Sequence, residues 1–324
     1  MGQNCKLAQK FNFMKNTIWF LLLFVTTSSF AQENKTTSQE IEVNSLIKGT
    51  LFSPEKVTKK TKLVILIAGS GPTNRSGNST IGGVNNSLKY LAEGLSQNGI
   101  AVFSYDKRIF AQMISKTVDE KTLSFEDFIH DTKDVITYFQ SQKKYSKIII
   151  AGHSEGSLIG MVAALNTADG YVSLDGAGRC IDEVLSEQIA KQAPTMKETV
   201  DKGLATLKEG KTFENKIPML ASLFRESVQP YMISWIKYNP QVEIKKLSIP
   251  ILLINGTKDL QVPTTDAELL HAVNPKSELK IIENMNHIFK EITVDEDNLK
   301  SYSNPNLPVM PELINTIATF VKSI

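Results

Sequence analysis

Short apolar runs alternate with amphipathic segments along most of the chain. The apolar runs have the length and composition of strands, and they lie at residues 63–68, 100–105, 147–151, 171–174, 251–254 and 279–282. Segments with helical spacing lie between them, at residues 87–97, 124–142, 155–166, 264–273 and 311–324. Because strands and helices alternate, we predict an α/β fold with a mainly parallel sheet flanked by helices.

The alternation stops between about residues 179 and 249. Charged helical patterns follow one another there without an intervening strand. Long insertions of this kind often lie over a binding site. We therefore predict a helical cap insertion at about 179–249, with a side excursion packed against the sheet as the alternative.

The first 31 residues have the pattern of a secretory signal peptide. Three lysines precede an apolar run at residues 18–25, and Ser29 and Ala31 supply small residues for cleavage before Gln32. The run is shorter than the roughly 20 apolar residues of a membrane-spanning helix. We expect a cleavable leader, no stable membrane anchor, and a secreted or periplasmic protein; an uncleaved anchor or a buried helix is the alternative.

The polar segment at residues 32–44 lacks periodicity, and we expect a flexible N-terminus with order beginning near Ile41. Residues 45–324 are long enough to bury an ample core, as one large α/β domain or two small ones. The composition, 41% hydrophobic and 22% charged, is that of a globular chain. The formal charge of +2 becomes −1 once the leader is removed, so nothing indicates a nucleic-acid partner. Only Cys180 then remains, which excludes an intrachain disulfide and a cysteine-rich metal site.

A candidate nucleophile stands at the end of one predicted strand. Residues 148–156 read IIIAGHSEG, so an apolar run ends in Gly-x-Ser-x-Gly and a helical pattern begins at once. A serine on a sharp strand-to-helix turn projects its hydroxyl, and the flanking glycines leave room for the crowded backbone. We predict that Ser154 is a nucleophile rather than a structural turn residue.

A serine hydroxyl needs a base within hydrogen-bond reach, and the chain has four histidines. His130 and His271 fall in helical stretches, and His153 should point away from its neighbour on the tight turn. His287 follows the strand at 279–282, and α/β sites gather in loops at the carboxyl ends of strands. His287 is therefore the predicted base.

The base in turn needs an acid that holds its productive tautomer. Asp259 follows the strand at 251–254 and keeps the chain order serine, acid, histidine, with one strand between acid and base. Asp175, at the end of the strand at 171–174, is its rival. A carboxylate that merely caps the next helix is the structural alternative for Asp259.

Attack on a carbonyl creates an oxyanion that needs preorganised donors. The loop at residues 69–78, GSGPTNRSGN, exposes backbone amides after the first core strand, and Glu155 offers another amide at a helix N-terminus. The loop lacks the Gly-Lys-Ser/Thr of a phosphate-binding loop and a dinucleotide fingerprint.

These motifs resemble the α/β-hydrolase superfamily, in its serine esterase and serine aminopeptidase-like branch, over residues 45–324. The resemblance implies that Ser154, Asp259 and His287 form a catalytic triad. It also implies that the backbone N–H groups of Ser70 and Glu155 stabilise the oxyanion, without a metal or organic cofactor. The segments 69–78 and 223–231 look like those of secreted bacterial carboxylesterases with a helical cap.

Two positions depart from that pattern. The glycine that usually follows the arginine of an Asp-x-Arg loop is absent after Arg108, so the resemblance does not define the shape of the nearby pocket wall. Asp175 stands where small apolar residues are common.

We therefore expect a secreted serine hydrolase that cleaves small-molecule carboxylic esters through an acyl-enzyme. A peptidase or aminopeptidase, a thioesterase, and a catalytically silent envelope-binding protein are the alternatives. A dehalogenase is disfavoured because the elbow carries serine where aspartate would be required.

Overall fold

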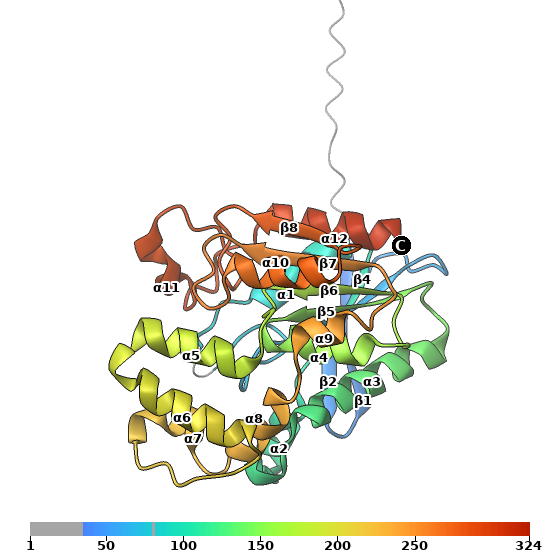
Figure 1. Cartoon of the computed structure of the whole chain (residues 1–324). Helices are drawn as coiled ribbons and strands as arrows, with labels where there is room; N and C mark the ends of the chain where they lie inside the picture. The colour runs from blue at the N-terminus through green and yellow to red at the C-terminus, as the bar shows by residue number, and fades with distance from the viewer. Residues whose placement is uncertain (1–34, 80–81) are drawn as a thin grey trace, which may run out of the picture. The chain divides into compact units, whose positions relative to one another are not determined.

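The computed structural model describes residues 35–79 and 82–324. An eight-stranded sheet with the order β1-β2-β4-β3-β5-β6-β7-β8 runs through it (Figure 1). The strands are β1 (Thr36–Asn44), β2 (Ile47–Pro54), β3 (Leu63–Ile67), β4 (Ala101–Tyr105), β5 (Ile148–His153), β6 (Gly170–Leu174), β7 (Ile251–Gly256) and β8 (Glu278–Ile282). The pairs β1–β2 and β2–β4 are antiparallel, and every other neighbouring pair is parallel. The prediction of a mainly parallel sheet is confirmed.

Helices cover both faces of the sheet. They are α1 (Ser87–Gln97), α2 (Arg108–Ser115), α3 (Phe125–Gln142), α4 (Glu155–Ala164), α5 (Ile181–Gln192), α6 (Lys197–Lys208), α7 (Ala221–Phe224), α8 (Gln229–Ile236), α9 (Pro240–Ile244), α10 (Thr264–Val273), α11 (Asn298–Ser301) and α12 (Pro311–Ser323). The apolar side chains of α1 and α12 belong to the core on one face, and those of α3, α4 and α10 to the core on the other.

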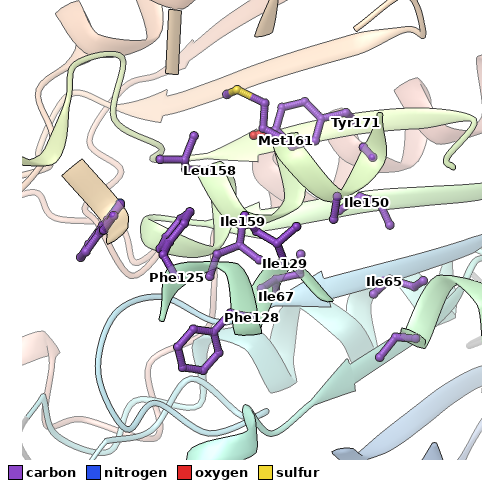
Figure 2. Packing of buried hydrophobic residues seen from close by; sticks show 14 of the residues in the cluster. Ile65, Ile67, Phe125, Phe128, Ile129, Ile150, Leu158, Ile159, Met161 and Tyr171 are labelled. Atoms are coloured by element: carbon purple, nitrogen blue, oxygen red, sulfur yellow. The ribbon is translucent and has the colours of Figure 1, made fainter. Parts of the chain in front are cut away.

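The two cores follow from the alternation of side chains along each strand. In β3, Ile65 and Ile67 pack on the side of α3 and α4, whereas Val64 and Leu66 pack on the side of α1 and α12. Figure 2 shows part of the first of these cores, where Ile67 lies beside Ile129 of α3 and Ile159 of α4. In each of the strands β3, β4, β5, β6 and β7, every residue is buried. This explains why these strands appear in the sequence as uninterrupted apolar runs.

The N-terminal strands correct one expectation. Residues 32–44 were expected to be flexible, but residues 36–44 form β1, which pairs along its length with β2. Most side chains of β1 are exposed, because it is an edge strand held by backbone hydrogen bonds. Its sequence therefore lacks the apolar pattern by which the inner strands can be found. The expected leader at residues 1–31 lies outside the described residues.

Helices α5 to α9 occupy the chain between β6 and β7 without an intervening strand in that part of the chain. In Figure 1, α5, α6, α7 and α8 form one group beside the sheet. Buried side chains such as Leu204, Phe224 and Trp235 join this group to the core that contains α3 and α4. Within the described ranges, no helix is long and apolar enough to cross a membrane.

Candidate active site

Ser154 lies on the sharp turn between β5 and α4. Its φ of 55° and ψ of −119° form a backbone conformation that is rare for residues with a side chain. A Cβ on Gly152 would come 2.0 Å from the carbonyl oxygen of Gly156, and a Cβ on Gly156 would come 2.6 Å from that of Ile67. The two glycines of Gly-x-Ser-x-Gly are thus required by contacts with backbone atoms, and the turn projects Ser154 from the end of the strand.

His287 and Asp259 form a hydrogen-bonded pair. The imidazole Nδ1 of His287 lies 2.7 Å from Oδ2 of Asp259, and both side chains are buried. The other carboxylate oxygen of Asp259 accepts hydrogen bonds from the backbone N–H groups of Gln261 and Val262, at 2.7 and 2.9 Å. Since Nδ1 donates to the carboxylate, the neutral imidazole presents Nε2 as a proton acceptor.

Ser154 and His287 line the same cavity of about 290 Å³. Among the described residues, no direct hydrogen bond joins the Ser154 hydroxyl to the imidazole. Contacts between a nucleophile and its base are often long in unliganded enzymes and tighten when the substrate binds. The structure therefore brings the three predicted triad residues to one site.

The other histidines do not serve as the base in this arrangement. His153 is buried, and its Nε2 lies 2.8 Å from the backbone oxygen of His287, to which it donates. Burial, and then the nearby His287, lower the pKa of His153 well below its ordinary value, so it supports the His287 loop as a neutral ring. His130 is exposed on α3, and His271 bonds to Ser277.

Asp175, the rival acid, is buried beside the pair without bonding to Nδ1 of His287. One of its oxygens accepts the N–H of Gly256 at 3.1 Å, and the other has no partner among the described residues. Burial raises its pKa well above the ordinary value, and the charge of Asp259 raises it further. Donor atoms of His153, Asp175 and His287 lie within 4.8 Å of one another, a spacing that a metal could use, but both imidazoles are already hydrogen-bonded.

The two predicted oxyanion donors lie next to the nucleophile. Ser70 and Glu155 line a second cavity of about 400 Å³ together with Ser154. The loop after β3 approaches so closely that a Cβ on Gly69 would lie 3.3 Å from the Cβ of Ser154. The backbone N–H groups of Ser70 and Glu155 are therefore available on the segments that border the nucleophile.

Lys107 is a residue of the site that the sequence analysis missed. Its Nζ donates to the backbone oxygen of Gly69 at 2.5 Å and to Oε1 of Glu155 at 2.9 Å, and it lies 5.3 Å from the centre of the Phe128 ring. In the sequence, the Asp-Lys-Arg segment at residues 106–108 differs from the family pattern only by the glycine missing after Arg108, and nothing in that pattern indicates a role for Lys107. In the structure α2 begins at Arg108, and Ile109 lines a cavity of about 150 Å³ next to Lys107.

The cavity of about 400 Å³ in front of Ser154 is mostly apolar. It is lined by Leu158 of α4 and by side chains of α5 and α8. The ring centres of Tyr231 and Trp235 on α8 lie 5.9 Å apart. The ring of Trp235 also stacks on that of Phe125, with 5.5 Å between the ring centres. Helices of the 179–249 segment thus line the space in front of Ser154.

A parallel sheet with a serine elbow, and with a histidine and an acid on later strand-end loops, defines an α/β-hydrolase. The chain belongs to the BD-FAE family of α/β-hydrolase esterases, whose model matches residues 50–273.

Three individual esterases resemble this chain in sequence or in fold. Esterase EstD of Thermotoga maritima is 30% identical over 265 residues, which are 77% of this chain and 59% of EstD. Est1E from Butyrivibrio proteoclasticus has the same fold at 15% identity, with a TM-score of 0.54 over 88% of this chain and 96% of Est1E. The Pyrococcus furiosus esterase Pf2001 superposes with a TM-score of 0.54 at 15% identity, over 90% of this chain and 91% of that one.

Proposed function

We propose that the protein hydrolyses carboxylic esters with Ser154 as nucleophile, His287 as general base and acid, and Asp259 as the residue that orients His287. The single observation that carries this proposal is the 2.7 Å bond between His287 Nδ1 and Asp259, because His287 also lines the cavity that contains Ser154 on its strained turn. A buried imidazole held in this way directs a basic nitrogen toward the space where the serine proton must leave.

The reaction follows from these positions. His287 takes the proton of Ser154 as the oxygen attacks the ester carbonyl, and the N–H groups of Ser70 and Glu155 stabilise the oxyanion. The intermediate then collapses, and His287 returns the proton to the departing alcohol. A water molecule, activated by the same imidazole, releases the acid from Ser154.

The cavity of about 400 Å³ supports a small or flat apolar acyl or alcohol group as the substrate class. Aromatic side chains on α8 favour a planar group by stacking. A structure of Est1E contains ferulic acid, so a hydroxycinnamate ester is the aromatic substrate to test first.

An aminopeptidase is less well supported. Such an enzyme needs a carboxylate that is free to bind the substrate amine, and Glu155 is the acid next to Ser154 in the sequence. Its carboxylate is buried and forms an ion pair with Lys107 at 2.9 Å. A second ammonium there would face the ammonium of Lys107, which favours ester over amine substrates.

The test measures hydrolysis of aryl acetate, aryl butyrate and a hydroxycinnamate ester, with labelling by a fluorophosphonate probe. We expect the wild type to be active and labelled, and Ser154→Ala to lose the label and to lose activity by at least about a thousandfold. Ser141→Ala, at an exposed position on α3, is the control and should match the wild type. Equal rates for wild type and Ser154→Ala would refute the mechanism, and a wild type that is neither active nor labelled would favour the silent binding protein.

A further inference from the structure

We propose that Lys107 is a positioning residue that holds both segments of the oxyanion hole in register. The inference rests on the proposed function, because it concerns the donors that would stabilise the oxyanion formed at Ser154. Lys107 itself does not touch the substrate in this proposal.

The contacts of one ammonium group carry the argument. Lys107 follows β4, and its Nζ reaches the backbone oxygen of Gly69 on the loop after β3 and the carboxylate of Glu155 at the start of α4. Both side chains of the Lys107–Glu155 pair are 3% exposed. A single buried charge therefore connects the two segments that carry the oxyanion donors.

The bond to Gly69 sets the direction of a donor. The carbonyl of Gly69 and the N–H of Ser70 belong to the same planar peptide unit, and in a trans peptide they point in opposite directions. When Lys107 holds the carbonyl on one side, the Ser70 N–H must point to the other. Rotation of this peptide, which would turn the donor away from the oxyanion, would break the bond to Lys107.

The bond to Glu155 fixes the second donor. Glu155 is the first residue of α4 and is pressed toward β3, because the next residue, Gly156, lies against the backbone oxygens of Ile67 and Ala68. An ion pair in this position ties the first turn of α4 to the same ammonium that holds the Gly69 peptide. Lys107 thus makes one contact with each of the two segments, and these two contacts together limit how far apart the N–H groups of Ser70 and Glu155 can move.

Little water reaches the bridge, because both of its side chains are almost completely buried. The ring of Phe128 lies 5.3 Å from Nζ, and Tyr231 of α8 borders the same small cavity as Lys107 and Glu155. Removal of only one charged partner would leave the other buried and uncompensated, which would destabilise the fold for reasons unrelated to catalysis. A fair test therefore neutralises both partners together.

The test compares Lys107→Met/Glu155→Gln with the wild type on one aryl ester and on the matching thionoester. We expect kcat for the ester to fall roughly tenfold to a hundredfold while KM stays within about twofold, because the oxyanion forms only in the transition state. Oxyanion donors distinguish oxygen from sulfur, so the ester-to-thionoester ratio of kcat/KM should also fall. Lys107→Gln/Glu155→Gln is the second variant should the first not fold, and the same two losses are expected from it.

The neighbouring, partly buried pair of Arg108 and Asp131 supplies the control. Arg108 bonds to Asp131 at 2.8 Å and ties α2 to α3 without contact to Gly69 or Glu155. Arg108→Met/Asp131→Asn should lower the melting temperature, yet leave kcat and the ester-to-thionoester ratio unchanged. If the Lys107 variants keep the wild-type kcat and ratio while the wild type is active and labelled, the positioning role is overturned and the proposed function stands. A wild type without activity or label would instead remove the proposed function.

Discussion

Two aspartates lie at the ends of neighbouring strands, and their contacts give them different chemistry. Asp259 after β7 bonds to the imidazole of His287 and accepts two backbone N–H groups, all of which stabilise its charge. Asp175 after β6 accepts one N–H group and is fully buried next to that charge. The pair therefore divides into a carboxylate that orients the base and a buried carboxyl group whose pKa is raised, first by burial and then by the charge of Asp259, which favours its protonated form.

This division predicts unequal effects of two matched substitutions. Asp259→Asn should lower kcat by roughly 10³- to 10⁴-fold, because the amide stabilises the wrong tautomer of His287. Asp175→Asn should change kcat less than about tenfold, since an amide resembles the protonated carboxyl and keeps the acceptor for Gly256. Steady-state kinetics on an aryl ester decides, and a larger loss in Asp175→Asn would identify it as the acting acid.

The raised pKa of Asp175 also predicts how stability depends on pH. Its pKa is raised in the folded protein, so its contribution is complete below the unfolded pKa of about 3.9 and is lost as the pH rises toward the folded pKa. Asp175→Asn lacks this loss. Its free energy of unfolding relative to the wild type should increase with pH above about 4, by at most about 1.4 kcal/mol per pH unit.

Urea unfolding of both proteins at several pH values measures this difference. His153, whose pKa is lowered, destabilises both proteins as the pH falls below about 6.5 and so cancels in the comparison. A difference that stays constant with pH would show that Asp175 is ionised in the folded protein.

At the level of elements, the approach of α4 to β3 places the nucleophile. Gly156 lies against backbone oxygens that cannot rotate away, whereas Gly94 of α1 lies against the end of the flexible Ile314 side chain. We expect Gly156→Ala to lower stability by about 1–3 kcal/mol and to reduce kcat by displacing the turn at Ser154. Gly94→Ala should stay within about 1 kcal/mol of the wild type, with unchanged kcat, because alanine favours the helix.

Thermal unfolding and steady-state kinetics on the two alanine variants check this prediction. An intact Ser154 turn in Gly156→Ala, shown by an unchanged rate of fluorophosphonate labelling, would mean that β3 and α4 can separate at little cost.

The elements that could be predicted from the sequence are those whose burial is visible in their own pattern of apolar residues. The parallel strands are buried on both faces and therefore appear as apolar runs, and Ser154 stands in a motif that needs only its local turn. The edge strand β1 is largely exposed and leaves no such pattern. Lys107 has its partners 38 and 48 positions away, so its role depends on strand order, which no local pattern contains.

At the scale of the whole molecule, the parallel sheet collects one chemical group from each strand end. The carboxyl ends of parallel strands meet at one edge, so residues far apart in the chain become neighbours. The six parallel strands β3 to β8 contribute, in chain order, Gly69, Lys107, Ser154, Asp175, Asp259 and His287. The site therefore depends on the complete order of the sheet, and a change in the pairing of any inner strand would remove a member.

Within the described residues, the first strand begins at Thr36. We propose that the leader at residues 1–31 directs export, which leaves a mature chain that starts at Gln32, four residues before β1. The full chain produced in a bacterial host should appear in the periplasm or medium with the mass of residues 32–324 and an N-terminal glutamine or its cyclised form.

A chain that lacks residues 1–31 should stay in the cytosol with the same melting temperature and kcat, because none of the strands that carry the site precedes Thr36. Ala31→Leu should block cleavage and retain the precursor. Intact-mass measurement on fractionated cells distinguishes these forms, and a cytosolic full-length chain that is never shortened would refute export.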